Sequence, residues 1–241
     1  MIQPTFRIFG EHAILIEWPF KIQEEGHAQL LTYRKLLALF NESIVETVVT
    51  YNSIAIYLKP KVDQLLLIEK IKSTISLASI TIDKQIKIWE VPCCYDAEFA
   101  IDSEAISNHC KLDFDACVAL HIKTPYRIYF HGFLPGFLYL GGLDAKLHVP
   151  RRATPRAKVA KGSVAIGGMQ TGIYPMQSPG GWNILGSTPI NLFDASNAAS
   201  PSPFRAGDYL QFKAISKRQF DAISGKVAKG KYKLKYTLKD D

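Results

Sequence analysis

Glycine and proline are concentrated in short blocks between residues 132 and 194, and these blocks restrict the possible folds more than any other feature of the chain. Most of the 16 glycines lie in this stretch. Glycine permits positive φ and close approach of neighbouring groups, whereas proline fixes φ near one value. The spacing therefore predicts a series of specified turns between short strands. The blocks are Gly132-Phe133-Leu134-Pro135-Gly136-Phe137, Pro150-Arg151-Arg152 with Pro155-Arg156, Gly167-Gly168-Met169-Gln170-Thr171-Gly172, and Ser178-Pro179-Gly180-Gly181-Trp182.

The composition is that of a soluble globular protein. The chain has 241 residues, of which 47% are hydrophobic, and this length fits one large domain or two of ordinary size. No apolar run approaches the roughly 18 residues needed to cross a bilayer. Arg7 and Glu11 interrupt the beginning of the chain, where a signal peptide would be apolar. We therefore expect a cytoplasmic protein with no membrane segment.

The first 90 residues follow a pattern typical of a ferredoxin-like domain. Alternating apolar residues predict four strands, the first with a bend at Gly10, and apolar residues at three- and four-residue steps predict two helices. The order βαββαβ is that of a ferredoxin-like unit. No catalytic side chains gather in it, so we expect a docking or packing domain over residues 1–90. The predicted strands are 6–18, 44–50, 53–59 and 85–91, and the predicted helices are 24–40 and 63–75.

Residues 91–214 are predicted to form a second domain, a β-barrel that begins with two helices. The first helix, 103–109, has Asp102 or Ser103 as its cap, and the second, 113–122, has Asp113. Short strands separated by turn signals then predict a closed or nearly closed barrel. These strands are 126–130, 163–166, 183–185, 190–193 and 209–212.

The last segment, 215–241, is predicted to be a basic extension. Most of the net charge of +7 lies after Gln211. Only two aromatic residues, Tyr232 and Tyr236, accompany these lysines, too few for a surface that stacks bases. A solvated extension is therefore favoured over nucleic-acid binding, and contact with an acidic partner surface stays open.

Three arginines in the block 150–156 form a candidate anion-binding site. Arg151, Arg152 and Arg156 lie between two prolines or directly beside one, which limits the freedom of the loop that presents them. Arginine holds a carboxylate or a phosphate with two parallel hydrogen bonds. The alternative, with equal weight, is that one or two of them pair with buried carbonyl groups or with a carboxylate of a partner protein.

The glycine pair in the block 178–182 is a second candidate for ligand contact. Gly180 and Gly181 permit a ligand to approach the backbone N–H groups, and Ser178 adds a hydroxyl. Gln170 and Tyr174 add polar groups from a neighbouring loop, so we include all five as candidate substrate- or anion-binding residues.

Several kinds of site have no support in the sequence. Cys93, Cys94, Cys110 and Cys117 lack the spacing of a zinc site, so no metal site is expected. The chain contains no phosphate-binding loop and no nucleophile elbow. The catalytic residues are therefore left unassigned.

The blocks resemble, in order and spacing, those of the B subunits of bacterial 5-oxoprolinases, a family also called allophanate hydrolase subunit 1. This family includes the Kip-type (KipI-like) inhibitors of a sporulation histidine kinase. The resemblance begins at Val91-Pro92-Cys93-Cys94-Tyr95, continues through Leu185-Gly186-Ser187-Thr188-Pro189 and ends near Phe212. It implies that the barrel domain is cyclophilin-like, and it favours a site role for His121, which ends an apolar helical segment.

The resemblance also implies a function. It predicts that this chain and a tightly bound C-type subunit use ATP with Mg²⁺, in a shared site, to activate 5-oxo-L-proline, and that an A-type subunit hydrolyses the activated lactam to L-glutamate. The chain is then expected to be inactive alone. Two alternatives stay open: a Kip-type inhibitor of a sensor histidine kinase, and a component of urea or allophanate metabolism.

Overall fold

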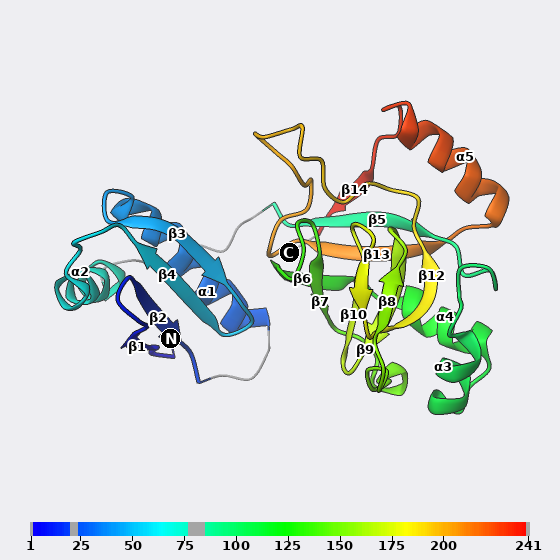
Figure 1. Ribbon diagram of the computed structural model, residues 1–241, viewed down its shortest axis with the longest axis horizontal. Helices are drawn as coiled ribbons and strands as arrows, with labels where there is room; N and C mark the ends of the chain where they lie inside the picture. The colour runs from blue at the N-terminus through cyan, green and yellow to red at the C-terminus, as the bar shows by residue number, and fades with distance from the viewer. Residues whose placement is uncertain (1, 20–23, 77–84, 240–241) are drawn as a thin grey trace. The chain divides into compact units, whose positions relative to one another are not determined.

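The computed structural model describes residues 2–19, 24–76 and 85–239, and all structural statements refer to these residues. The chain forms two compact units, Met1–Lys84 and Gln85–Asp241 (Figure 1). Each unit combines helices with a largely antiparallel sheet, so the predicted α+β class is confirmed. No helix in these ranges is long and apolar enough to cross a membrane.

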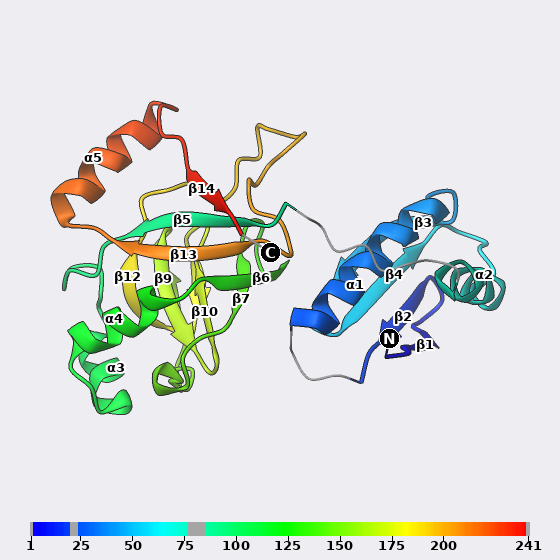
Figure 2. The same ribbon diagram turned by 180° about the vertical axis from the view of Figure 1, so that it is seen from behind.

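The first unit is a four-stranded antiparallel sheet with helices packed on it. Ile54 and Ile56 of one central strand face Ile16 and Ile14 of the other, and all four are fully buried. Figure 2 shows α1 crossing the sheet. The sheet order is β1-β2-β4-β3, and the elements are β1 (Thr5–Ile8), β2 (Ala13–Glu17), α1 (Glu24–Leu37), a 3₁₀ turn η1 (Ala38–Phe40), β3 (Ile44–Val49), β4 (Ser53–Leu58) and α2 (Gln64–Ser76).

The predicted ferredoxin-like arrangement of this unit forms in part: its helices and its hairpin β3–β4 form where expected, but its first and last predicted strands differ. Gly10 adopts a φ of +76° and allows the chain to reverse, so the first predicted strand is instead the hairpin β1–β2. Strands β2 and β4 pair antiparallel and β3 lies beside β4, as the first three strands of a βαββαβ unit do. The last predicted strand exists as β5 (Lys87–Cys93), but it pairs in the second unit.

The second unit is built on an eight-stranded sheet. Its order is β12-β9-β10-β7-β6-β13-β5-β14, and only the pair β13–β5 is parallel. A separate two-stranded ribbon joins β8 to β11. The strands are β5, β6 (Tyr126–His131), β7 (Leu138–Gly141), β8 (Arg156–Val159), β9 (Ser163–Gly167), β10 (Gln170–Ile173), β11 (Ser178–Gly180), β12 (Asn183–Ser187), β13 (Tyr209–Ala214) and β14 (Lys235–Leu238).

The predicted barrel does not close along a strand ladder. Among the described residues, one isolated bridge joins β12 to the residue after β5, where Cys94 and Ser187 exchange backbone hydrogen bonds of 2.8 and 2.9 Å. Strand β14 pairs with β5 from Lys87 to Glu90, so that edge of β5 is already occupied there. The sheet is therefore open. The predicted strand 190–193 is also wrong, because Ile190 and Leu192 are buried without joining a sheet.

Four helical segments accompany this sheet. The helix α3 (Ser103–Cys110) packs on β12, and α4 (Phe114–Lys123) packs on β13. Both confirm predicted helices, and the Asp113 carboxylate caps α4 by accepting a hydrogen bond of 2.7 Å from the N–H of Ala116. The other two segments are the 3₁₀ turn η2 (Ala145–Leu147) and α5 (Lys217–Ala228).

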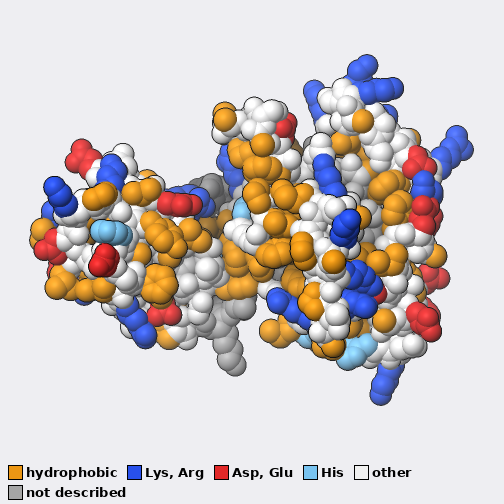
Figure 3. All heavy atoms as spheres, viewed as in Figure 1, with side chains coloured by type: hydrophobic (Ala, Val, Ile, Leu, Met, Phe, Trp, Pro, Cys, Tyr) orange, Lys and Arg blue, Asp and Glu red, His pale blue; other side chains and the backbone are white. Residues whose placement is uncertain are grey.

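Of the predicted basic extension 215–241, the described residues 215–239 fold onto the second unit instead of forming a solvated extension. Ser216 and Gln219 form a capping box that begins α5. After α5, Tyr232 and Leu234 pack against the core, and the ring of Tyr236 lies 4.9 Å from that of Trp89. Lys and Arg side chains project around the α5 end of the unit in Figure 3. The apolar residues between the lysines therefore anchor this segment.

Replacing Tyr232 and Leu234 together by alanine is expected to lower the free energy of unfolding by about 2–4 kcal/mol, because partly buried apolar contacts are lost. Urea unfolding followed by tryptophan fluorescence measures this loss. The matched control replaces the exposed neighbours Lys231 and Lys233 by alanine and should change stability by less than about 0.5 kcal/mol. Equal losses in the two double variants would contradict this anchoring role.

Candidate functional site

Asp102 is a buried carboxylate at the start of α3 that connects distant segments of the second unit. Its side chain is only 4% exposed. It does not cap α3 with its side chain. Instead, one carboxylate oxygen accepts a hydrogen bond of 2.7 Å from the backbone N–H of Ile184 in β12. The backbone N–H of Asp102 donates in return to the carbonyl of Ile184 at 3.1 Å. Helix α3 is thereby fixed to β12.

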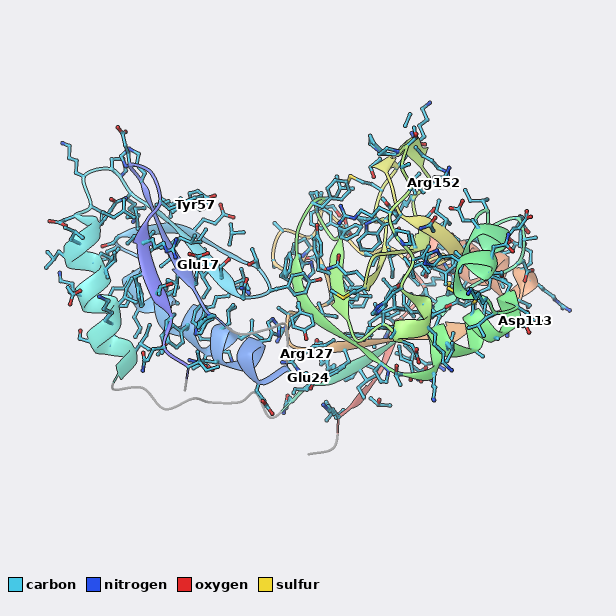
Figure 4. The ribbon with its side chains drawn as sticks, turned by 90° about the horizontal axis from the view of Figure 1, so that it is seen from below. Glu17, Glu24, Tyr57, Asp113, Arg127 and Arg152 are labelled. Carbon is cyan, nitrogen blue, oxygen red and sulfur yellow. The ribbon has the colours of Figure 1, made fainter. Side chains whose placement is uncertain are left out.

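The remaining acceptor positions of Asp102 are taken by two of the predicted anion-binding arginines. Arg156 donates through both terminal nitrogens, at 2.6 and 3.0 Å, in a two-pronged contact. Arg152, which comes from the loop before β8 (Figure 4), donates one further hydrogen bond of 3.1 Å. The sequence left open that one or two of these arginines pair with a carboxylate of a partner protein. Two of them do pair with a carboxylate, but it belongs to the same chain.

Arg151 differs from its two neighbours. It is exposed, and within the described residues its guanidinium pairs with no carboxylate. It lies over the ring of Trp182, with the guanidinium carbon 5.8 Å from the ring centre. Of the three predicted arginines, only Arg151 is therefore directed to solvent without an internal anion.

Trp182 is held in place by glycines of the neighbouring strands. A Cβ atom at Gly167 would lie 2.6 Å from the indole ring, and one at Gly172 would lie 3.0 Å from it. Both glycines thus leave room for the ring, which is 6% exposed. The ring of Phe137 packs edge-on at 5.6 Å. The glycine block 167–172 therefore supports an aromatic side chain.

Tyr174 lies beside Trp182 and Gly180. It is 2% exposed, and burial raises the pKa of its phenol, while the Trp182 backbone, Arg151 and Arg156 act in the opposite direction. A Cβ atom at Gly180 would overlap the hydroxyl of Tyr174, so glycine is required at this position. Tyr174, Gly180 and the three arginines therefore belong to one neighbourhood.

The other candidates near the ribbon have simpler surroundings. The carbonyl of Gly181 accepts a hydrogen bond of 2.8 Å from the N–H of Arg152. Ser178 begins β11, is buried, and donates to the carbonyl of Pro179 at 3.2 Å. Gln170 lies at the opposite end of β10, four residues before Tyr174, where it faces Gly167 of β9. These residues stay candidates for ligand contact.

His121 is enclosed in the protein interior, and this corrects its predicted role in binding. It is 0% exposed and stacks on Phe212. Its Nε2 lies 2.8 Å from the hydroxyl of Thr171, which itself donates to the carbonyl of Ala165 at 3.2 Å. The Thr171 oxygen must then accept from an Nε2–H, which leaves Nδ1 to accept from the Tyr95 hydroxyl at 2.8 Å. Burial lowers the pKa of His121 to about 3, so the ring is neutral.

The block 132–137 forms the tip of the hairpin β6–β7. It surrounds an open hollow of about 320 Å³ that also includes His131. Phe133 has a φ of +65° and an exposed ring, and Gly136 has a φ of +82°. A Cβ atom at Gly136 would lie 2.6 Å from the Cβ of Phe193. This block therefore needs glycine to pack against the segment that follows β12.

Replacing Asp102 by alanine is expected to lower the free energy of unfolding by about 2–4 kcal/mol. The loss is smaller than for a fully buried ion pair, because the two unpaired arginines can still reach solvent. Chemical unfolding measures this value. The comparison is Asp113→Ala, which removes an exposed helix cap and should cost about 1 kcal/mol. If Asp102→Ala lowered the free energy of unfolding by less than Asp113→Ala, the buried carboxylate would not be a main source of stability in this unit.

His121 is expected to make stability depend on pH between its ordinary pKa of 6.5 and its lowered value of about 3. In this range the unfolded chain binds a proton that the folded chain excludes, so stability falls as the pH falls. Wild type should lose about 1.4 kcal/mol per pH unit more than His121→Gln in unfolding titrations. The control His109→Gln alters an exposed residue of α3 and should keep the wild-type slope; a His121→Gln slope equal to wild type would contradict the assignment.

Comparison with known proteins places these blocks in a family. The family described as "Carboxyltransferase domain, subdomain C and D" matches residues 4–204. The B subunit of 5-oxoprolinase from Haemophilus influenzae is 36% identical over 203 residues, which cover 84% of this chain and 94% of that protein. The protein of the same name from Bacillus subtilis is 38% identical over 148 residues, and the match spans 61% of each chain.

Among solved structures, the Kluyveromyces lactis urea amidolyase matches 98% of this chain with a TM-score of 0.80 and 19% identity. This chain covers 16% of that protein, and the likeness shows a shared fold. The sequence matches extend over most of the chain and include the blocks around Arg151 and Trp182. The chain therefore belongs to the carboxyltransferase subdomain C and D family together with the 5-oxoprolinase B subunits, and the resemblance seen in its blocks is confirmed.

Proposed function

We propose that this protein is the B subunit of an ATP-dependent 5-oxoprolinase. The supporting observation is the 36% identity to a protein of that name over 94% of its length. The cluster around Asp102, Trp182 and Arg151 adds a place where a small anion can meet a guanidinium. The likeness to urea amidolyase, at 19% identity, adds no argument about the reaction.

The proposed reaction activates the carbonyl group of a five-membered lactam. Its amide is stabilised by resonance, so direct attack by water is slow. Transfer of the terminal phosphoryl group of ATP to the carbonyl oxygen forms a C–O–P linkage and releases ADP. Attack by one water at the same carbon, with departure of the ring nitrogen as the amine, opens the C–N bond and leaves an acyl phosphate. A second water then releases phosphate and yields L-glutamate. Positive charge beside the transferring phosphoryl group stabilises the charge of the transition state.

The residues of this chain are better suited to binding an anion than to carrying out the whole ATP-dependent reaction. The described residues contain no group of three or more His, Cys, Asp or Glu side chains that could hold a metal ion. The exposed Arg151 supplies donors for a carboxylate or a phosphate. In the proposed enzyme, as the family resemblance implies, ATP and Mg²⁺ bind in a site shared with a C-type subunit, and an A-type subunit performs the hydrolytic step.

The proposal predicts that glutamate forms from 5-oxo-L-proline and ATP when this chain is combined with its C-type and A-type partners. Purified components are mixed and each is omitted in turn, with glutamate and ADP as the measured products. Omission of this chain should abolish turnover, and the chain alone should show none, because it holds only part of the site.

Two results would contradict the proposal. Full turnover by the single chain would remove the need for a shared site. A stable complex that forms no glutamate would favour another amide substrate or the Kip-type alternative, and inhibition of autophosphorylation of a purified sensor histidine kinase would then distinguish between them.

A further inference from the structure

We infer that Asp102 is a positioning residue that holds Arg152 and Arg156 as internal cations and so leaves the exposed Arg151 to receive the anion of the ligand. The anion is a carboxylate or a phosphate. This inference deepens the proposed function, since both 5-oxo-L-proline and ATP carry such a group. Of the three arginines in the block 150–156, two then have a structural role and one contacts the ligand.

The carboxylate of Asp102 has no acceptor capacity left for further partners. A carboxylate offers about four lone-pair positions, and Asp102 uses four: two for Arg156, one for Arg152 and one for the N–H of Ile184. Its side chain is 4% exposed, whereas those of Arg152 and Arg156 are 34% and 23% exposed. The arginines are therefore drawn inward onto a fixed negative charge.

This pairing determines the course of the loop that carries Arg151. The N–H of Arg152 donates to the carbonyl of Gly181, and Arg156 begins β8 opposite Gly180 of β11. Arg151 precedes Arg152 directly and lies over Trp182, the residue after Gly181. On the other side of Arg151, the carbonyl of Pro150 accepts a hydrogen bond of 2.9 Å from the Asn183 amide. With its neighbours held on both sides, the Arg151 guanidinium lies over the indole face, and it pairs with no carboxylate among the described residues.

Tyr174 supports the same side of the ribbon from the interior. It packs in the buried cluster that contains Trp182, is 2% exposed, and its hydroxyl lies against Gly180. Burial keeps the phenol protonated, since its pKa lies above the ordinary value of 10.0. The exposed guanidinium of Arg151 beside this buried cluster is a group that suits a carboxylate or a phosphate.

The pairing can be tested on the full-length chain without turnover. Phenylglyoxal modifies free guanidinium groups, and peptide mass spectrometry locates the modified residues. Arg151 should react as fast as the exposed Arg218, and Arg152 and Arg156 at least about fivefold more slowly, because their nitrogens are held by a carboxylate. Asp102→Asn should bring all three to similar rates. Equal rates in the wild-type chain would overturn the inference, whatever the enzyme does.

Ligand contact is tested in the reconstituted enzyme. Arg151→Gln should lower kcat/KM by about 10- to 100-fold, with part of the loss restored in Arg151→Lys. A raised KM for 5-oxo-L-proline alone identifies the carboxylate as the anion, and a raised KM for ATP alone identifies the phosphate. The matched control is Lys158→Gln, an exposed cation of β8 that should leave both constants unchanged.

The role of Asp102 is tested by a double-mutant cycle. If Asp102 acts through Arg151, Asp102→Asn should lower kcat/KM in wild type but have little further effect in the Arg151→Gln background. Fully additive effects, or wild-type kinetics of Arg151→Gln, would overturn the inference while the proposed function stands. Absence of turnover in the wild-type assembly would instead refute the proposed function, and the labelling result would still decide the pairing.

Discussion

The buried carboxylate of Asp102 is the contact on which the arrangement of the second unit around its arginine loop depends. One side chain binds the backbone of β12, both prongs of Arg156 and one nitrogen of Arg152. An ionised carboxylate with this little exposure is stable only when its oxygens are satisfied by donors and by opposite charge. Helix α3, strand β12, the loop before β8 and the ribbon β8–β11 are consequently held in one geometry.

A second constraint comes from glycines that make room for aromatic rings. Gly167 and Gly172 leave space for Trp182, and Gly180 leaves space for the hydroxyl of Tyr174. The same ribbon thus brings an indole, a phenol and a guanidinium together at the end of the arginine loop. The glycine-rich blocks therefore make room for aromatic rings at this end of the arginine loop.

The charges of this neighbourhood also bear on the proposed division of work within the enzyme. Two of three arginines are neutralised in part by Asp102, and the neutral His121 lies inside the core. A site with one solvent-directed guanidinium can orient a carboxylate or a phosphate, but it carries little of the positive charge that phosphoryl transfer needs. In the proposed enzyme, the remaining charge and the metal ion come with the C-type partner.

Much of the fold and part of the candidate site could be predicted from residues close in sequence. Periodic apolar residues and the Asp113 cap identified α1, α2, α3 and α4, and the ordered blocks identified the family. Local sequence also placed Arg151, Tyr174 and Gly180 among the candidates. These features depend on backbone preferences and on neighbours a few positions away, which the sequence determines by itself.

The partners of Asp102 were decided by the tertiary structure alone. The residues that bind Asp102 are 50, 54 and 82 positions away, so nothing near it distinguished a helix cap from the centre of a charge cluster. The transfer of β5 to the second unit, the pairing of β14 with β5 and the open sheet likewise follow from which edges are occupied after packing. The burial of His121 has the same origin, because exposure depends on every segment that packs around a residue and not on its place in a helix.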